Sequence, residues 1–291
     1  MRLGYLGPAG TFSEQALRAA TAGTSEAERV AFATIHETIM AAQEGAVDAV
    51  LVPIENSVEG AVTVTLDAIA TDAPDLHIAG EHVLTIELAL IGTTDIALPD
   101  ITVVRSHPHA TAQCAGFLRT ALPAARVLST TSTAEAVRTV GAGEGAIGTR
   151  LAAELYDRVV LRDAVQDEGD HETRFVWLAR DAGAVALLVG GEGAGGGPVA
   201  HKTSVLFAGA GDDTPGWLAR CLLEFAQRDV NLTRIESRPL RRRLGHYRFL
   251  VDAEGSDAGP AVADAIAALR LRCEEVRVLG SYPVQDPARR R

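Results

Sequence analysis

The chain has 291 residues and a mass of 30.5 kDa, which is long enough for one large or two ordinary domains, and we expect two. Hydrophobic residues make up 47% of the sequence and charged residues 22%, so a disordered chain is excluded. The formal net charge of -11 argues against non-specific binding to nucleic acid or to an anionic membrane. Any anionic ligand must therefore be held by local positive groups.

The three cysteines, Cys114, Cys221 and Cys273, are far apart and form no CxxC pair. We expect reduced thiols, no disulfide framework and no zinc site. The first apolar run is broken by Gly4 and Pro8, too early for a signal peptide, and no stretch of about 18 apolar residues could span a membrane. These features predict a cytoplasmic protein.

Short β-prone runs alternate with helical patterns from residue 1 to about residue 182. The expected strands cover residues 3–6, 46–54, 82–91, 101–105, 127–129 and 145–148. The expected helices cover residues 13–22, 35–44, 63–70, 111–122, 134–140 and 150–156. Repeated units of this kind predict an α/β fold with an open, largely parallel sheet covered by helices.

Small or hydroxyl-bearing residues precede several of the expected helices. They are Thr11, Asn56-Ser57, Ser106 and Thr130 to Thr133. Each alone is most simply a helix cap. A helix N-terminus also offers unpaired N–H groups and a positive dipole end, so four such loops together with Arg174 favour a carboxylate or phosphate ligand in one cleft. No GxxxxGK[ST] or GxGxxG pattern follows the first strand, which argues against a nucleotide site.

Thr173 and Arg174 stand between an acidic run, residues 166–172, and an apolar, β-prone run, residues 175–179. They are therefore expected at the mouth of a strand, where α/β proteins commonly place ligand chemistry. Taken alone, such a pair is more often the polar edge of a loop.

Residues 183–201 are rich in glycine and predict a flexible linker between two domains. Beyond it, strands are expected over residues 203–208, 232–238, 247–252 and 276–279, with helices over 215–228 and 259–272. The order βαββαβ is the ferredoxin-like arrangement. The tail, residues 285–291, is expected to be solvated.

The ordered set of motifs along the chain resembles the prephenate dehydratase family. The matching stretches are Gly7-Pro8-Ala9-Gly10-Thr11-Phe12-Ser13, Val52-Pro53-Ile54-Glu55-Asn56-Ser57, Ser106-His107-Pro108, Gln113-Cys114, Ser132-Thr133-Ala134, Thr173-Arg174-Phe175, Glu236-Ser237-Arg238-Pro239 and Leu279-Gly280-Ser281-Tyr282-Pro283. Each motif is modest alone, but the set spans nearly the whole chain.

The resemblance implies a catalytic domain over residues 1–182, made of two lobes like a periplasmic binding protein. A linker (183–201), an ACT regulatory domain (202–284) and the tail (285–291) follow. The implied reaction removes the ring carboxylate of prephenate as CO2 and its C4 hydroxyl as water, giving phenylpyruvate for phenylalanine biosynthesis. The resemblance implies no metal and no organic cofactor.

The resemblance also implies roles for individual residues. Thr173 matches the essential threonine of the family and would polarise the leaving hydroxyl. The implied substrate-binding residues are Asn56, Ser57, Ser106, Gln113, Thr133, Arg174 and Phe175. The implied site for L-phenylalanine as allosteric effector comprises Gly216, Leu218, Asn231, Leu232, Glu236, Ser237 and Arg238. A homodimer or homotetramer with the effector at the shared interface is expected, with no nucleic-acid or membrane partner.

Three departures from the family pattern leave alternatives open. Asp170-His171-Glu172 stands where the family usually has an asparagine, His109 replaces a glutamine, and Trp217 replaces an alanine of the effector loop. A metal site at His107 and His109 is disfavoured, since no third ligand is suitably spaced. An arogenate-preferring dehydratase remains an alternative, as does a non-catalytic amino-acid sensor.

Overall fold

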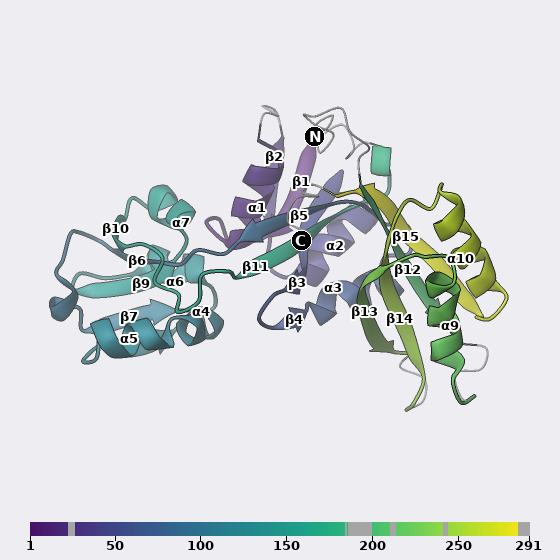
Figure 1. The fold of residues 1–291 in the computed structure, drawn as a ribbon. Helices are drawn as coiled ribbons and strands as arrows, with labels where there is room; N and C mark the ends of the chain where they lie inside the picture. Colours follow the sequence, from purple (N-terminus) through teal and green to yellow (C-terminus); the bar gives the residue numbers. More distant parts are fainter. Residues whose placement is uncertain (23–26, 184, 186–199, 210–213, 241–243, 285–291) are drawn as a thin grey trace.

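Three β-sheets stand side by side in the computed structural model, which describes residues 1–22, 27–183, 185, 200–209, 214–240 and 244–284 (Figure 1). We call the part built on the middle sheet the central lobe (residues 1–85 and 172–179) and the part built on residues 86–171 the outer lobe. The third sheet, which begins at His201, is the C-terminal sheet. Among the described residues no helix is both long and apolar enough to cross a membrane.

The central lobe has a six-stranded sheet in the order β2-β1-β3-β11-β5, with the short β4 paired to β3. Its strands are β1 (Arg2–Leu6), β2 (Glu28–Phe32), β3 (Ala49–Asn56), β4 (Gly60–Ala61), β5 (His77–Thr85) and β11 (Glu172–Ala179). Its helices are α1 (Phe12–Ala20), α2 (Ile35–Gln43), α3 (Thr63–Asp67) and the π-helical turn η1 (Ala68–Asp72). The expected largely parallel sheet is wrong here, because β11 returns from the outer lobe and pairs antiparallel with both β3 and β5.

Strand β11 is apolar on both sides because both sides of this sheet are covered. Phe175 and Trp177 pack in one cluster with Leu3 and Leu17 of β1 and α1. Val176 and Leu178 point the other way, as alternation along a strand requires, into the cluster that contains the buried side chains of α2 and α3. The sequence of β11 therefore reads as a continuous apolar run and not as an alternating one.

The outer lobe has a five-stranded sheet in the order β10-β6-β9-β7-β8. Its strands are β6 (Ala89–Gly92), β7 (Val103–Ser106), β8 (Arg126–Ser129), β9 (Glu144–Gly148) and β10 (Val159–Arg162). Its helices are η2 (Leu98–Asp100), α4 (Pro108–Gln113), α5 (Ala115–Ala121), α6 (Thr133–Thr139) and α7 (Arg150–Leu155).

Two expected elements are each divided in the structure. The β-prone run 82–91 belongs to β5 and β6, which lie in different sheets, so one hydrophobic run crosses between the lobes. The expected helix 111–122 breaks at Cys114 into α4 and α5. The carboxylate of Asp167 accepts hydrogen bonds from the N–H groups of Gly116 and Phe117 at 2.6 and 2.8 Å, so a distant side chain caps the second helix.

The C-terminal sheet has the order β13-β14-β12-β15 and every pairing in it is antiparallel. Its elements are β12 (His201–Ala208), α9 (Trp217–Ala226), β13 (Leu232–Pro239), β14 (Tyr247–Glu254), α10 (Pro260–Arg270) and β15 (Glu275–Pro283). The predicted βαββαβ arrangement is confirmed. Helices α9 and α10 cover one face through a cluster that includes Val205, Phe207 and Val251.

The other face of the C-terminal sheet packs directly on the central lobe. Leu206, Leu250 and Leu279 lie in the same hydrophobic cluster as Val176 and Leu178 of β11, so the two sheets share one core. Strand β15 crosses β5 at Gly280, where a Cβ atom would lie 2.8 Å from the carbonyl carbon of Ile78. Only glycine lets the two backbones approach this closely.

Three arginines of the C-terminal sheet fasten it to the helical edge of the central lobe. Arg238 forms a two-pronged ion pair with Asp67 at 2.7 and 2.9 Å, and Arg248 donates to the hydroxyl of Thr71 at 3.0 Å. Arg277 donates to the carbonyl of Ala70 at 3.1 Å. All three contacts fall on the end of α3 and on η1.

Most of the predicted linker, residues 184 and 186–199, lies outside the described residues, as does the predicted tail.

Candidate active site at the start of β11

The side chains of Asn56 and Thr173, which are 117 positions apart in sequence, meet at the end of β3 and the start of β11. The amide Nδ2 of Asn56 donates to Oγ1 of Thr173 at 2.9 Å. The amide is oriented by its other end, since Oδ1 accepts hydrogen bonds from the N–H groups of Val58 and Glu59 at 2.9 and 3.1 Å. Oδ1 can only accept, so Nδ2 must be the group that faces Thr173. The threonine oxygen therefore receives a hydrogen bond, and its own proton remains available to a ligand.

Ser57 continues this junction on the same pair of strands. Its Oγ accepts from the N–H of Glu172 at 3.0 Å, and its own N–H donates to the carbonyl of Glu172 at 2.9 Å. Thr173 is mostly buried, and no second side-chain hydrogen bond to it is found in the described part of the chain. The structure thus brings together three of the predicted site residues, Asn56, Ser57 and Thr173.

The predicted site residues Ser106, Gln113 and Thr133 belong to the outer lobe. One side-chain contact joins the start of α4 in that lobe to the loop after Asn56. The side chain of His109, at the start of α4, contacts the carboxylate of Glu59, which belongs to the loop just after Asn56. Ser106 precedes that helix, but its hydroxyl is buried and donates to the carbonyl of Ile147 at 2.8 Å. Gln113 ends α4 and Thr133 begins α6. In the described part of the chain, no hydrogen bond joins the side chain of Gln113 or Thr133 to Thr173.

Two of the hydroxyl groups expected to line an anion site, those of Thr11 and Ser132, act as helix caps. Thr11 accepts from the N–H of Glu14 at 3.4 Å, and Ser132 accepts from the N–H of Glu135 at 3.0 Å. At the start of α1 the N–H of Gly10 already donates to the buried carboxylate of Glu14 at 2.6 Å. That helix end is occupied by a side-chain anion, so the expectation of an anion site there is wrong.

Arg174 points away from Thr173, to the opposite face of the sheet. Its Nη2 donates to Asp252 of β14 at 2.7 Å, its Nη1 donates to Glu81 of β5 at 3.2 Å, and its Nε lies 3.2 Å from Glu55. Adjacent residues of a strand face opposite sides, so Arg174 and Thr173 cannot contact one small ligand together. Phe175 is 1% exposed within the core cluster beside α1. Neither Arg174 nor Phe175 therefore lies where it could bind substrate beside Thr173, as had been predicted.

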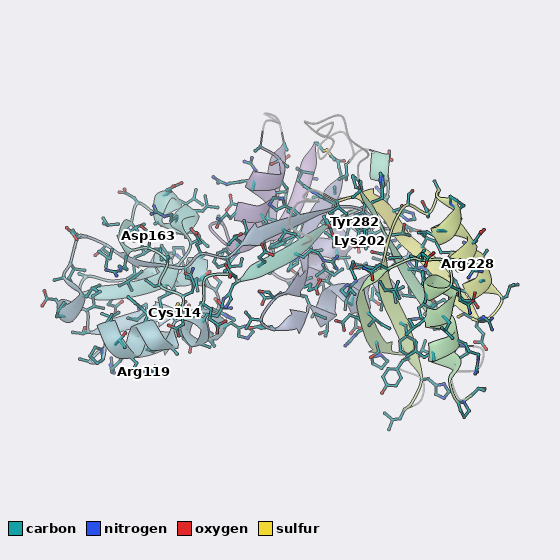
Figure 2. The ribbon with its side chains drawn as sticks, in the orientation of Figure 1. Cys114, Arg119, Asp163, Lys202, Arg228 and Tyr282 are labelled. Atoms are coloured by element: carbon teal, nitrogen blue, oxygen red, sulfur yellow. The ribbon has the colours of Figure 1, made fainter. Side chains whose placement is uncertain are left out.

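Arg174 belongs to a buried group of charges that we call the Arg174 cluster, namely Glu81, Arg174, Lys202, Arg234 and Asp252. Lys202 donates to Glu81 at 2.7 Å, and Arg234 donates to both oxygens of Asp252 at 2.8 and 3.3 Å. Figure 2 shows Lys202 at the junction of the central lobe and the C-terminal sheet. No sequence pattern indicates this cluster, because its members come from five strands and carry no local motif.

The electrostatics of the cluster are dominated by burial and by pairing. Burial alone would raise the pKa of the fully buried Asp252 carboxyl, but the guanidinium groups of Arg174 and Arg234 outweigh it and hold the pKa well below its usual range. Burial lowers the pKa of Lys202, and the carboxylate of Glu81 only partly opposes that effect. Ser204 donates to Asp252 at 2.6 Å and also contacts the hydroxyl of Tyr282 at 2.9 Å. Burial raises the pKa of Tyr282, which therefore stays neutral.

Acid should weaken the folded state through Asp252. Its folded-state pKa is depressed, so its stabilising contribution is complete above the unfolded value of about 4 and is lost as the pH falls through the lower folded value. The Asp252→Asn variant should be less stable than the parent at pH 7, and the difference should shrink below about pH 4. Urea unfolding at fixed protein concentration measures it. A difference that stays constant down to acid pH would contradict this account.

The residues predicted to bind an effector fall into two groups. Gly216 and Leu218 line a pocket of about 220 Å³ together with Trp217, Tyr247 and Phe249. The other five lie on β13 or just before it, namely Asn231, Leu232, Glu236, Ser237 and Arg238. None of the five lines that pocket, and Arg238 is already paired with Asp67. Within one copy, Leu218 and Leu232 pack against the same hydrophobic cluster, but the other four residues of the second group are not among those that line the pocket.

Trp217, which departs from the family pattern in the predicted effector loop, belongs to the core of the C-terminal sheet. It is 6% exposed, it packs against Phe207 and Phe249 at ring-centroid distances of 6.1 and 6.0 Å, and its Nε1 donates to the carbonyl of Arg272 at 3.1 Å. Gly216 before it has φ +78°, a left-handed conformation that favours glycine. Within the described residues no group of three or more His, Cys, Asp or Glu side chains could hold a metal ion.

Comparison with known proteins agrees with this geometry. The family model described as "Prephenate dehydratase" matches residues 3–183. A prephenate dehydratase of Amycolatopsis methanolica is 42% identical over 287 residues, which cover 98% of this chain and 89% of that protein. The crystal structure of prephenate dehydratase from Arthrobacter aurescens, in complex with L-Phe, has a TM-score of 0.85 at 38% identity and covers 99% of this chain and 92% of the other.

A further solved structure carries a different description. A protein described as a novel type of quorum-quenching acylase has a TM-score of 0.83 at 29% identity, with complete coverage of both chains. The same overall fold is thus associated with more than one activity, and fold alone does not decide the reaction. The family model and the 42% identical relative bear on this chain more directly. On these grounds the chain belongs to the prephenate dehydratase family.

Proposed function

We propose that the protein is a prephenate dehydratase, a carbon–oxygen lyase that converts prephenate to phenylpyruvate, CO2 and water. The observation that carries the proposal is the hydrogen bond from Asn56 to Thr173 in a chain of this family. It supplies one polarised hydroxyl at the end of a rigid strand, which is what departure of the C4 hydroxyl requires.

In this mechanism Thr173 acts as a hydrogen-bond donor to the leaving oxygen. A threonine hydroxyl is a poor acid by itself, but the hydrogen bond it accepts from Asn56 fixes the direction of its own O–H. Stabilising the oxygen as the C4–O bond breaks lets the electron pair of the departing carboxylate bond enter the ring. The ring becomes aromatic, CO2 leaves, and the oxygen departs as water once protonated. Positioned donors of this kind contribute roughly 10²–10⁴-fold.

Turnover with prephenate tests the reaction directly. The purified protein should form phenylpyruvate from prephenate, and arogenate should be turned over more slowly if the keto acid is the preferred substrate. An acyl-homoserine lactone serves as a control for the acylase activity described for the 29% identical protein. Binding of prephenate without product would exclude the proposal and favour an amino-acid sensor.

L-Phenylalanine is proposed as the effector, bound between two copies of the chain. The pocket at Gly216 could hold the aromatic ring, and residues of β13 from a second copy would complete the site. Strand β13 is an edge of its sheet, and Ile235 on β13 and Leu223 on α9 are 46% and 48% exposed. Such apolar exposure at a sheet edge suits a homodimer or a larger assembly. Feedback inhibition by L-phenylalanine is the expected result, and titration with tyrosine and tryptophan tests whether either also acts. A cytoplasmic location also remains a prediction.

A further inference from the structure

Strand β11 presents the proposed catalytic hydroxyl on one face and a buried arginine on the other. Thr173 contacts Asn56, while the next residue, Arg174, is held by Asp252 of the C-terminal sheet. We infer that Arg174 is a positioning residue through which the C-terminal sheet controls the placement of Thr173. The inference rests on the function proposed above and adds a mechanism for its regulation.

Two buried ion pairs of the Arg174 cluster, Arg174–Asp252 and Lys202–Glu81, bridge the central lobe and the C-terminal sheet. Glu81 and Arg174 belong to the central lobe, while Lys202, Arg234 and Asp252 belong to the C-terminal sheet. All five side chains are at most 10% exposed. Water cannot replace a lost partner of these buried charges. If one sheet shifts against the other, either Arg174 moves with its partners or a buried charge is left unpaired.

Three strand pairings shift register close to the cluster. The pairing of β11 with β3 shifts register directly after Arg174, and the pairing of β12 with β15 shifts directly after Ser204. The pairing of β13 with β14 shifts between Leu232 and Arg234. Bulges bend a strand locally and re-aim side chains, and they are common beside functional sites. Both the central sheet and the C-terminal sheet are therefore irregularly paired close to residues of the Arg174 cluster.

The bulge in β13 also connects the cluster with the predicted effector residues. Leu232 packs on the helix-covered side of the sheet, whereas Arg234, two positions later, faces the central lobe and binds Asp252. A ligand that contacts Asn231 and Leu232 would act on the same strand that holds the Asp252 carboxylate. The line of contacts then runs from Leu232 to Arg234, Asp252 and Arg174, and ends one peptide bond away at Thr173.

Small displacements at Thr173 are sufficient for control. A misplacement of about 1 Å at a reacting group can cost on the order of 10²-fold in rate. Substrate binding would depend less on this displacement, because Thr173 acts on the leaving oxygen during the reaction. The inference therefore predicts effects on kcat and on the response to effector, with KM for prephenate largely retained.

The decisive experiment compares two buried carboxylates of the C-terminal domain. Asp252→Asn removes the charge that holds Arg174. Glu224→Gln is the matched control, since Glu224 is also buried and pairs with two arginines, Arg228 and Arg272, but contacts only its own domain. We expect Asp252→Asn to lower kcat at least 10-fold with KM within 3-fold, and saturating L-phenylalanine to change its rate much less than that of the parent. Glu224→Gln should resemble the parent in all three quantities.

A charge-balanced variant guards against simple unfolding of Asp252→Asn. The double variant Asp252→Asn with Arg234→Gln removes one charge of each sign from the cluster, so it should fold more readily, as checked by circular dichroism. It should still show the lowered kcat and the weakened effector response. Parent-like kcat and inhibition in a folded double variant would overturn the inference.

Arg174→Lys separates this inference from a substrate-binding role. An ammonium cannot bridge Glu81 and Asp252 as the planar guanidinium does, so kcat should fall while KM is retained. A raised KM with unchanged kcat would return Arg174 to the substrate site and overturn the inference.

A readout without turnover distinguishes failure of this inference from failure of the proposed function. Hydrogen exchange followed by mass spectrometry should show faster exchange in the peptide that covers β11 for Asp252→Asn, with β1 unchanged. Glu224→Gln should leave both peptides unchanged. Equal exchange in β11 of the parent and of Asp252→Asn would refute the coupling, whether or not prephenate proves to be the substrate.

Discussion

Replacing Thr173 by valine should reduce kcat by roughly 10²–10⁴-fold, the range that a positioned proton donor contributes. Valine keeps the branched shape of threonine but has no hydroxyl to stabilise the leaving oxygen. It also leaves Nδ2 of Asn56 without its acceptor. Prephenate binding should survive, because the lost interaction acts mainly in the transition state. Steady-state kinetics and calorimetric titration with prephenate measure the two effects separately.

The matched control for this experiment is Thr173→Ser. Serine retains the hydroxyl that accepts from Asn56 and donates to the substrate, so it should keep most of the activity. If the valine variant turned over prephenate at a near-normal rate, Thr173 would have no part in the chemistry. If valine and serine were equally impaired, packing at this position would matter and the hydroxyl would not.

Replacing Gly280 by alanine should destabilise the contact between the C-terminal sheet and the central lobe. The added Cβ would lie 2.8 Å from the carbonyl carbon and 3.0 Å from the nitrogen of Ile78, and a strand backbone cannot move aside as a flexible side chain can. Overpacking of this kind typically costs about 1–3 kcal/mol. Thermal unfolding should show a fall in Tm of several degrees.

Gly169→Ala is the control for Gly280→Ala. Apart from Gly169 and its two chain neighbours, no heavy atom of the described residues lies within 4 Å of the Cβ that alanine would add at position 169, so the same chemical change should leave Tm nearly unaltered. Gly280 lies on β15 close to Tyr282, whose hydroxyl contacts Ser204, and Ser204 donates to Asp252 of the Arg174 cluster. Inhibition by L-phenylalanine should therefore weaken along with stability. An unchanged Tm in Gly280→Ala would show that β15 and β5 can separate at little cost.

The sequence is most informative where local chemistry decides the structure. The ferredoxin-like order of the C-terminal sheet follows from strands and helices that each have a clear period, and it is confirmed. The caps Thr11 and Ser132 act as hydroxyl caps should. Likewise, Thr173 lies at the start of a strand because an acidic loop ends where an apolar run begins.

Long-range pairing is what the sequence leaves undetermined. Nothing local to the run 82–91 indicates that it divides between two sheets, since both parts are apolar and β-prone. Nor does anything local separate Arg174 from Thr173, whose adjacency in the chain suggests a common ligand. Their opposite orientation follows from alternation along a strand once β11 is known to begin at Glu172 and so to include both residues.

The hydrophobic cluster shared by the two sheets means that the central lobe and the C-terminal sheet do not have separate cores. Leu206, Leu250 and Leu279 complete a core whose other half lies on β11, the strand that also carries Thr173. A chain truncated before β12 would expose to solvent the apolar side chains of the central lobe that now pack against the C-terminal sheet. Arg174 would also lose its ion pair with Asp252. The C-terminal sheet of this chain is therefore not a separable unit, because the core of the central lobe is complete only when that sheet is present.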